Sequence, residues 1–339
     1  MHNRTSFVTE QPRPIGLSRR TLGAAIAGSI MLAGRPAFAQ NSYPDRPIRI
    51  VVPYSPGGGT DLIARGLAQR FQIQMGQPGI VDNRAGASGI IGCQYVMQQP
   101  ADGYTLLIGA TTTHSIIPVL YKKPPFDPLK DFAPVSLLAT MPHVLVVATS
   151  LPIHNVAEFR AYAKAHPGLA YGSAGVGSPH HLAGEMLKSS MGLDLVHIPY
   201  KGTAPALADV MGGQIGFISI EYTAALEQIK AGKVRPIAVA AKERIPGFDV
   251  PTFAEQGMPE FVVSSWYAMY APAKTPQLLV QKLSKEVADG LNSPELRDRL
   301  NNLGAKPVGS TPEQLFSYNK QQLNQWAKVV KISGATADI

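Results

Sequence analysis

The segment Ile48–Asp61 is the part of the sequence that most constrains the fold. A short apolar strand runs into a turn with two prolines and three successive glycines, and a helix start follows at Thr60-Asp61. Glycine lets the backbone approach a ligand closely, and the first N–H groups of a helix lack a partner inside the helix. The segment therefore predicts an anion site built mainly from backbone, and similar turns recur at Gly86–Gly92 and Gly172–Ser178.

The first 39 residues have the features of an export signal. The pair Arg19-Arg20 precedes the apolar run Leu22–Ala33, and Ala37-Phe38-Ala39 is a small-x-small cleavage motif. The run is shorter than the roughly 20 residues of a membrane-spanning helix, so we expect cleavage after Ala39. The paired arginines favour twin-arginine export, with an ordinary secretory signal as the alternative. Either route predicts a mature protein in a bacterial periplasm.

Charge and cysteine content narrow the function classes. The chain has 31 Lys+Arg and 23 Asp+Glu; the signal carries five of the arginines and one glutamate, which leaves 26 basic and 22 acidic side chains. This small excess of positive charge, without a run of basic residues, does not indicate nucleic-acid binding. It is compatible with binding of an anionic ligand. The single cysteine, Cys93, lies among apolar residues, so we expect it in the core. No sequence pattern indicates a cofactor.

Strand-forming and helix-forming segments alternate through most of the mature chain, which predicts an α/β protein with mostly parallel sheets flanked by helices. The expected strands are 48–53, 80–82, 105–110, 144–148, 170–172, 194–198, 215–220 and 237–240, and the expected helices are 61–75, 89–98, 111–120, 156–165, 179–191, 204–212 and 223–231. We expect two lobes joined by two crossover segments, near Ala139–Ala148 and Val262–Ala271. Residues 40–142 and 265–339 form lobe 1 in this interpretation, and residues 143–264 form lobe 2.

The C-terminal region differs, because helices follow one another there without full strands between them. Thr275-Pro276, Ser293-Pro294 and Thr311-Pro312 each place a hydroxyl residue before a proline, as at a helix start. Three amphipathic helices cannot bury their apolar faces alone, so we expect them to close lobe 1. Ligands of open α/β sheets bind beyond the carboxyl ends of the strands, where all three glycine turns are expected.

Several sequence blocks resemble one known family. They are PDRPIRIVVPYSPGGGTDLIAR (44–65), VDNRAGASGIIG (81–92), PADGYTLLIGATTTHSIIP (100–118), YGSAGVGSPHHLAGEML (171–187), HIPYKGTAPALADVMGGQI (197–215) and AGKVRPIAV (231–239). Together they resemble the Bug family of extracytoplasmic solute receptors, which are associated with tripartite tricarboxylate transporters. The resemblance implies a two-lobed periplasmic binding protein of type II that binds di- or tricarboxylates, acidic amino acids or aromatic carboxylates. It also implies that backbone groups and ordered waters hold the ligand carboxylate between the first two loops.

The first two turns supply the candidate ligand-binding residues of the first lobe. Tyr54 can close over a ligand or pack at the strand end, and Asp61 can recognise a ligand amine or neutralise the helix N-terminus. The first turn contributes Tyr54, Ser55, Gly57, Gly58, Gly59, Thr60 and Asp61. The second turn and the next strand end contribute Ala87, Ser88, Gly89, Thr112 and His114.

The second lobe is expected to meet the far end of a diacid when the lobes close. Its candidates are Ser173, Gly177, Ser178, Tyr200 and Glu221. Glu221 is a poor partner for an anion and suits an amino group instead. His180-His181 followed by Glu185 lacks the zinc-motif spacing of two histidines four residues apart, so no metal ligand is expected.

The leading hypothesis is a receptor that binds a small carboxylate between two lobes and delivers it to a membrane permease of the tripartite tricarboxylate type. A second hypothesis is a subunit that reports ligand occupancy to a membrane signalling protein such as a sensor kinase, because the same cleft would serve. A periplasmic hydrolase is disfavoured, since neither Ser173 nor Ser178 lies in a G-x-S-x-G motif. We therefore expect no enzymatic activity.

Overall fold

The computed structural model describes residues 43–57, 59–302 and 304–334. The expected signal peptide, its cleavage site and Gly58 of the first turn lie outside these residues. The chain divides into two compact units, residues 1–43 and 44–339, and the second contains every element named below. None of the described helices is long and apolar enough to cross a lipid bilayer.

The element order follows the expected alternation of strands and helices. The strands are β1 (Ile48–Val52), β2 (Gly79–Asn83), β3 (Thr105–Ala110), β4 (Phe132–Ala148), β5 (Leu169–Ser173), β6 (Leu195–Pro199), β7 (Phe217–Glu221), β8 (Val234–Val239), β9 (Ser264–Pro272) and β10 (Lys306–Pro307). The helices are α2 (Gly59–Met75), η1 (Ala87–Gly89), α3 (Ile90–Met97), η2 (Thr112–Ile116), α4 (Ile117–Leu120), α5 (Val156–Ala165), α6 (Pro179–Met191), α7 (Thr203–Met211), α8 (Tyr222–Lys230), α9 (Gln277–Leu291), α10 (Pro294–Asn302) and α11 (Pro312–Ser333).

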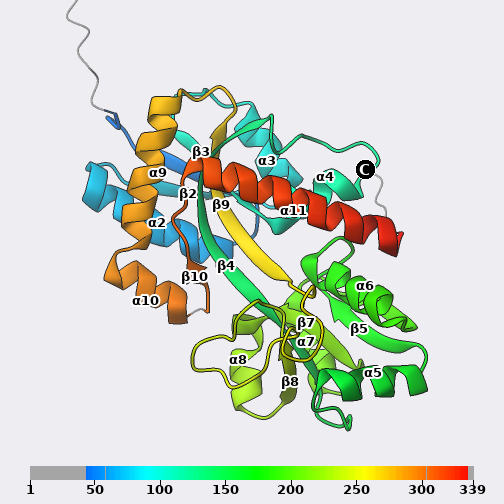
Figure 1. Cartoon of the computed structure of the whole chain (residues 1–339). Coiled ribbons are helices and arrows are strands. Elements are labelled where there is room, and N and C mark those ends of the chain that lie inside the picture. The colour runs from blue at the N-terminus through cyan, green and yellow to red at the C-terminus, as the bar shows by residue number, and fades with distance from the viewer. Residues whose placement is uncertain (1–42, 58, 303, 335–339) are drawn as a thin grey trace, which may run out of the picture. The chain divides into compact units, whose positions relative to one another are not determined.

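The strands pair in the order β2-β1-β3-β9-β4-β7-β5-β6, and β8 and β10 also pair with β4. The outer strands are parallel, as expected, whereas β4 and β9 pair antiparallel to their neighbours. Residues 132–142 of β4 pair with β9, and residues 143–148 pair with β7 and β8. One long strand therefore serves both sheets, beside β9 in Figure 1. This arrangement confirms the two-lobed α/β architecture, with mixed rather than mostly parallel sheets; the exact lobe boundaries stay a prediction.

The first half of β4 is the main difference from the expected elements. The sequence predicts a strand only from residue 144, because the preceding stretch is rich in proline. The structure begins β4 at Phe132 and shifts its register against β9 between Pro134 and Ser136. Proline cannot donate a ladder hydrogen bond, and such an irregularity accommodates it inside a strand.

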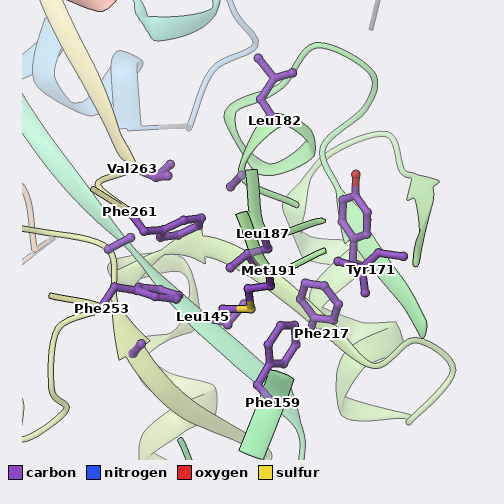
Figure 2. Packing of buried hydrophobic residues seen from close by; sticks show 14 of the residues in the cluster. Leu145, Phe159, Tyr171, Leu182, Leu187, Met191, Phe217, Phe253, Phe261 and Val263 are labelled. Atoms are coloured by element: carbon purple, nitrogen blue, oxygen red, sulfur yellow. The ribbon is translucent and has the colours of Figure 1, made fainter. Parts of the chain in front are cut away.

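Hydrophobic clusters lie against both parts of the sheet. In the second lobe, Phe159 and Phe217 meet edge to face with ring centroids 4.9 Å apart, and Figure 2 shows this pair with Tyr171 and Met191. In the first lobe, Cys93 is fully buried as expected, and burial raises the pKa of its thiol. This environment makes Cys93 an inert packing residue.

The C-terminal helices do more than close the first lobe. Thr311 forms a capping box with Gln314 at the start of α11, as its sequence predicts. At Thr275 and Ser293 the hydroxyls instead donate to backbone carbonyls of the preceding turn. The far part of α11 joins the second-lobe cluster, where its buried side chains are Trp326, Val329 and Val330. Helix α11 therefore packs on both lobes.

Candidate functional site

Asp61 holds the first glycine turn in place. Its carboxylate is 2% exposed and accepts hydrogen bonds from the Gly57 N–H at 3.0 Å, from Arg65 at 2.9 Å and from Asn83 at 3.1 Å. Burial alone would raise the pKa of Asp61, but the hydrogen bonds from Arg65, Gly57 and Asn83 lower it. The carboxylate thus has its partners within the chain, which favours a positioning role over recognition of a ligand amine.

The second turn carries unusual backbone conformations. Ala87 and Ser88 have φ of 46° and 54°, in the left-handed region that non-glycine residues rarely occupy, and Gly89 follows with φ of 98°. Such strain persists only where the surroundings enforce it, and it is enriched at ligand-binding turns. Ala87 and Ser88 are exposed, whereas Gly89 is buried and its N–H donates to the Gly86 carbonyl at 2.9 Å.

The first two turns lie against each other. The Asn83 amide donates to the Tyr54 carbonyl at 3.2 Å as well as to Asp61. A methyl group added at Gly89 would touch the Tyr54 ring at 3.4 Å and would clash with Thr113 Cγ2 at 2.6 Å, so this position requires glycine. The structure therefore brings the two turns together, as a shared anion site requires. Ser55 and Gly57 are exposed at this edge, whereas Thr60 is buried in the first turn of α2.

The Tyr54 hydroxyl is buried and has no hydrogen-bond partner within standard distance among the described residues. Burial raises its pKa strongly; the nearby Thr113 and Thr112 hydroxyls only partly oppose this. Thr112 is half-buried beside the Tyr54 hydroxyl, so this predicted site residue lies close to the two turns.

His114 lies elsewhere. Its ring is fully buried, stacks on Tyr270 with centroids 4.0 Å apart and packs near Phe126 and Phe132. Burial lowers the pKa of His114 to about 3, so the ring is neutral. The sequence places His114 at a strand end, but the wide turn of η2 directs it into the aromatic core. It therefore does not join the other site candidates.

The third turn satisfies its own polar groups. Ser173 accepts from the Gly175 N–H at 3.0 Å and lies 2.6 Å from His197 Nε2. Ser178 caps α6 by accepting from the His181 N–H, and it donates to the Gly175 carbonyl at 2.7 Å. The Gly177 N–H donates to His181 Nδ1 at 3.2 Å. A methyl group at Gly177 would lie 2.4 Å from Leu120 Cδ2, so this turn touches α4.

Tyr200 is also engaged within its own lobe. Its hydroxyl donates to Asp209, and burial together with this bond raises the pKa of Tyr200 to about 12. The ring therefore stays neutral, and its hydroxyl already has a strong acceptor.

Glu221 lies in a polar cluster at the end of β7. Its carboxylate is 2.8 Å from His180 Nε2, 2.7 Å from the Ser265 hydroxyl and 3.7 Å from His143 Nε2. His143 is its cross-strand partner on β4, and His180 comes from the first turn of α6. Burial alone would raise the pKa of Glu221, but the adjacent His180, with His143 and Ser265, lowers it well below its usual range. Burial lowers the pKa of His143 to about 4.

Tyr267 on β9 connects this cluster to the first turn. A methyl group at Gly59 would lie 3.2 Å from the Tyr267 hydroxyl. Burial raises the pKa of Tyr267 most, and the nearby Glu221 carboxylate and Tyr54 hydroxyl raise it further. The first turn, Tyr267 and the Glu221 cluster are therefore neighbours. Sequence reasoning named Glu221 and considered His180 only in a metal motif that it rejected; it missed His143, Ser265 and Tyr267. Strand pairing and the packing of α6 bring these distant residues together, which leaves no local signal.

A separate groove of about 1400 Å³ lies between α6, the segment 257–264 and α11. Its lining includes Met186, Phe261, Phe316, Lys320 and Lys328. Of the predicted site residues that the structure describes, none lines this groove. The candidate site is therefore the junction of the first two turns with the Glu221 cluster.

Two lobes joined through β4 and β9, with glycine turns at the strand ends, define the fold of a periplasmic solute-binding protein. The family model "Tripartite tricarboxylate transporter family receptor" matches residues 63–335. The chain belongs to this family, in agreement with the resemblance of its sequence blocks. It is a solute-binding protein and not an enzyme.

Individual relatives agree with this assignment. The chain is 37% identical over 316 residues to the protein BugT of Bordetella pertussis, covering 92% of this chain and 97% of BugT. It is 35% identical to a UPF0065 protein of the tcbD-tcbE intergenic region of Pseudomonas sp., covering 94% and 96% of the two chains.

Solved structures are similar as well. Rpa4515 of R. palustris with adipate has a TM-score of 0.79 at 37% identity, covering 88% of this chain and all of that one. MatC of Rhodopseudomonas palustris with bound malate has a TM-score of 0.75 at 34% identity, covering 85% and 100%. The periplasmic binding protein BugD has a TM-score of 0.76 at 37% identity, covering 88% and 100%.

Proposed function

We propose that this chain is a periplasmic receptor that binds a small carboxylate at the junction of its first two turns and delivers it to a membrane permease of the tripartite tricarboxylate type. The observation that carries the proposal is that the first two turns touch: Asn83 donates to the Tyr54 carbonyl and to Asp61, and Gly89 approaches the Tyr54 ring. The first N–H groups of α2 and the strained backbone of η1 together offer donors to one anion.

The ligand class rests on the relatives. Adipate and malate, in two of the similar structures, are both dicarboxylates. Charge-assisted hydrogen bonds contribute roughly 1.5–3 kcal/mol each, so four to six donors suffice for micromolar binding, which corresponds to about −8 kcal/mol. Backbone donors of this kind fit di- and tricarboxylates, acidic amino acids and aromatic carboxylates alike.

A thermal-shift titration of the exported protein tests the ligand class. Adipate, malate, citrate, glutamate and benzoate form the panel, and the uncharged diamide of adipate is the matched control. An acid present at 100 times its Kd stabilises the folded state by about 2.7 kcal/mol, so the Tm rises. Equal responses to adipate and its diamide, or no response to any acid, contradict carboxylate binding.

Export and delivery have separate tests. Mass spectrometry of the protein from a periplasmic extract should show a mature chain that begins at Gln40. Replacing both Arg19 and Arg20 by lysine should abolish export if the twin-arginine route operates. Cells that express the cognate permease should take up a labelled acid only when this receptor is present; binding of a sensor-kinase ectodomain without such uptake would favour the sensing role.

A further inference from the structure

The cluster around Glu221 has a property that carboxylate binding by backbone donors does not use. His143, His180 and Glu221 each offer one atom that can bind a metal ion, and these atoms lie within 4.8 Å of one another. The residues come from β4, α6 and β7, so three separate elements converge on this point. His143 and Glu221 are paired residues in the antiparallel β4–β7 ladder, which fixes their spacing.

The distances suit a transition-metal ion. Ligand atoms bound at 2.0–2.2 Å in a tetrahedral site stand about 3.3–3.5 Å apart. The His180 Nε2 to Glu221 distance is 2.8 Å and the His143 Nε2 to Glu221 distance is 3.7 Å, so small side-chain shifts bring both to this range. Two imidazoles and one carboxylate are ligands typical of Zn²⁺ and its neighbours, not of Ca²⁺ or Mg²⁺.

The groups around the cluster orient its ligands. His143 Nδ1 lies 3.3 Å from the Ser219 hydroxyl, and its Nε2 lies 3.1 Å from the Ser265 hydroxyl and 3.7 Å from Glu221. The Ser265 hydroxyl donates to Glu221 Oε1 at 2.7 Å. Hydrogen bonds of this type commonly hold metal ligands in position.

His180 provides an independent observation. The residue is only 4% exposed, and its Nδ1 is buried with no hydrogen-bond partner among the described residues. Buried polar atoms almost always have a partner. This Nδ1 lies on the edge of the ring opposite Nε2, which faces Glu221, so no acceptor in the described chain fixes the tautomer of His180 and Nε2 can be the metal-binding nitrogen.

The charges around the cluster also favour a bound cation. A carboxylate beside an anion site repels an anionic solute, and Tyr267 places Glu221 close to the first turn. A divalent cation held by Glu221 and two neutral imidazoles gives this position a net positive charge. With three protein ligands, one coordination position stays open for an oxygen atom of the solute.

We propose that His143, His180 and Glu221 form a binding site for a divalent transition-metal ion of the Zn²⁺ type, whose open position takes a carboxylate oxygen of the solute. The metal site stands on the geometry alone, and the contact with the solute rests on the proposed function. The receptor then recognises a metal–carboxylate pair instead of a free acid.

Zinc binding by the exported protein tests the site. After removal of metal by a chelator, titration calorimetry with Zn²⁺ should give one equivalent bound, and Co²⁺ should give the visible absorption of a tetrahedral site. Glu221→Gln, which keeps the side-chain shape, and His180→Ala should each weaken Zn²⁺ binding by roughly 100-fold or more. Circular dichroism establishes that each variant is folded.

The matched control is His154→Ala. His154 pairs with Glu158 at 3.0 Å on the exposed surface, so it represents an adventitious histidine–carboxylate site. Zn²⁺ binding should survive this change. Absence of binding to the wild type, or loss in His154→Ala but not in Glu221→Gln and His180→Ala, overturns the proposal.

The acid panel, repeated with chelator and with Zn²⁺, separates this inference from the proposed function. Tighter acid binding in the presence of Zn²⁺ supports both the metal site and carboxylate binding. Acid binding by a protein that does not bind Zn²⁺ overturns the metal site and leaves the proposed function standing. Zn²⁺ binding without any response to acids supports the metal site and contradicts carboxylate reception.

Discussion

The turns of the two lobes look alike in sequence but differ in how their polar groups are satisfied. The second-lobe turn, residues 173–178, closes on itself through the hydroxyls of Ser173 and Ser178 and the ring of His181. In the first lobe, residues 86–89 hold two non-glycine residues at positive φ, and no side chain caps η1 in the described part of the chain. A turn whose polar groups bond to one another is a scaffold, whereas an exposed turn with a strained backbone is suited to hold a ligand. Glycine content alone therefore does not distinguish the two roles.

Acid pH should have the largest effect on stability, and it acts on the second-lobe turn as well as on the buried His114 and His143. Burial lowers the pKa values of His181 and His197 to about 4. Because these values lie below 6.5, the unfolded chain binds more protons between pH 6.5 and about 4, and stability falls as the pH drops through this window. The expected loss between pH 7.5 and 4.5 is about 2 kcal/mol for His181 and less for the half-buried His197, measured by urea unfolding at each pH.

Two variants test this pH effect. His197→Gln should reduce the pH-dependent loss, because one of the buried rings no longer titrates. His166→Gln, at an exposed ring, should leave the loss unchanged. Unfolding free energies that do not change between pH 7.5 and 4.5 would show that these rings are not buried in neutral form.

Asp61→Ala should have the next largest effect, on the first turn. It removes the acceptor for Gly57, Arg65 and Asn83, and we expect the free energy of unfolding to fall by about 2–3 kcal/mol, since Arg65 is half exposed and contributes little. Asp289→Ala is the control: it breaks an exposed pair with Lys285 and should cost about 0.5 kcal/mol or less. Equal losses in urea unfolding would mean that Asp61 does not hold the turn.

Gly177→Ala tests the contact of the second-lobe turn with α4. Positive φ and the close approach of Leu120 should together lower the free energy of unfolding by about 1–2 kcal/mol, and acid binding should weaken. Gly192→Ala has a similar positive φ but no neighbour within 4 Å. It should destabilise less and leave the affinity unchanged; identical behaviour of the two variants in calorimetry would argue against a role for the Leu120 contact.

The smallest expected change concerns the strained second turn. Ser88→Gly relieves the positive φ and should stabilise the fold by about 0.5 kcal/mol, yet weaken acid binding because the hydroxyl is lost. Ala87→Gly relieves similar strain without removing a polar group, so its affinity should stay at the wild-type value. Retained affinity in both variants would remove the Ser88 hydroxyl from the site.

Local signals predicted the secondary structure well wherever capping and periodicity agree. Helices α5 and α6 have the expected bounds, and the structure shows the caps Asn155 and Ser178 that define their starts. The early part of β4 was missed because its prolines suggest a loop, and only pairing with β9 makes it a strand.

The candidate site was predictable only in part. The paired first two turns follow from strand–glycine–helix patterns, which are local. The burial of His114 depends on Phe126, Phe132 and Tyr270, which are distant in sequence. The grouping of His143, His180 and Glu221 depends on strand register and helix packing, so no spacing rule could reveal it.

Because helix α11 contributes to the second-lobe core, it affects when that core can fold during translation. Trp326, Val329 and Val330 are buried in the same cluster as Phe159 and Phe217, about 110–170 residues earlier in the chain. The second lobe therefore cannot complete this cluster until α11 has left the ribosome. A nonsense mutation that deletes only α11 would leave apolar side chains of the second lobe exposed to solvent, although all the described strands precede α11. We expect such a product to aggregate or to be degraded by proteases.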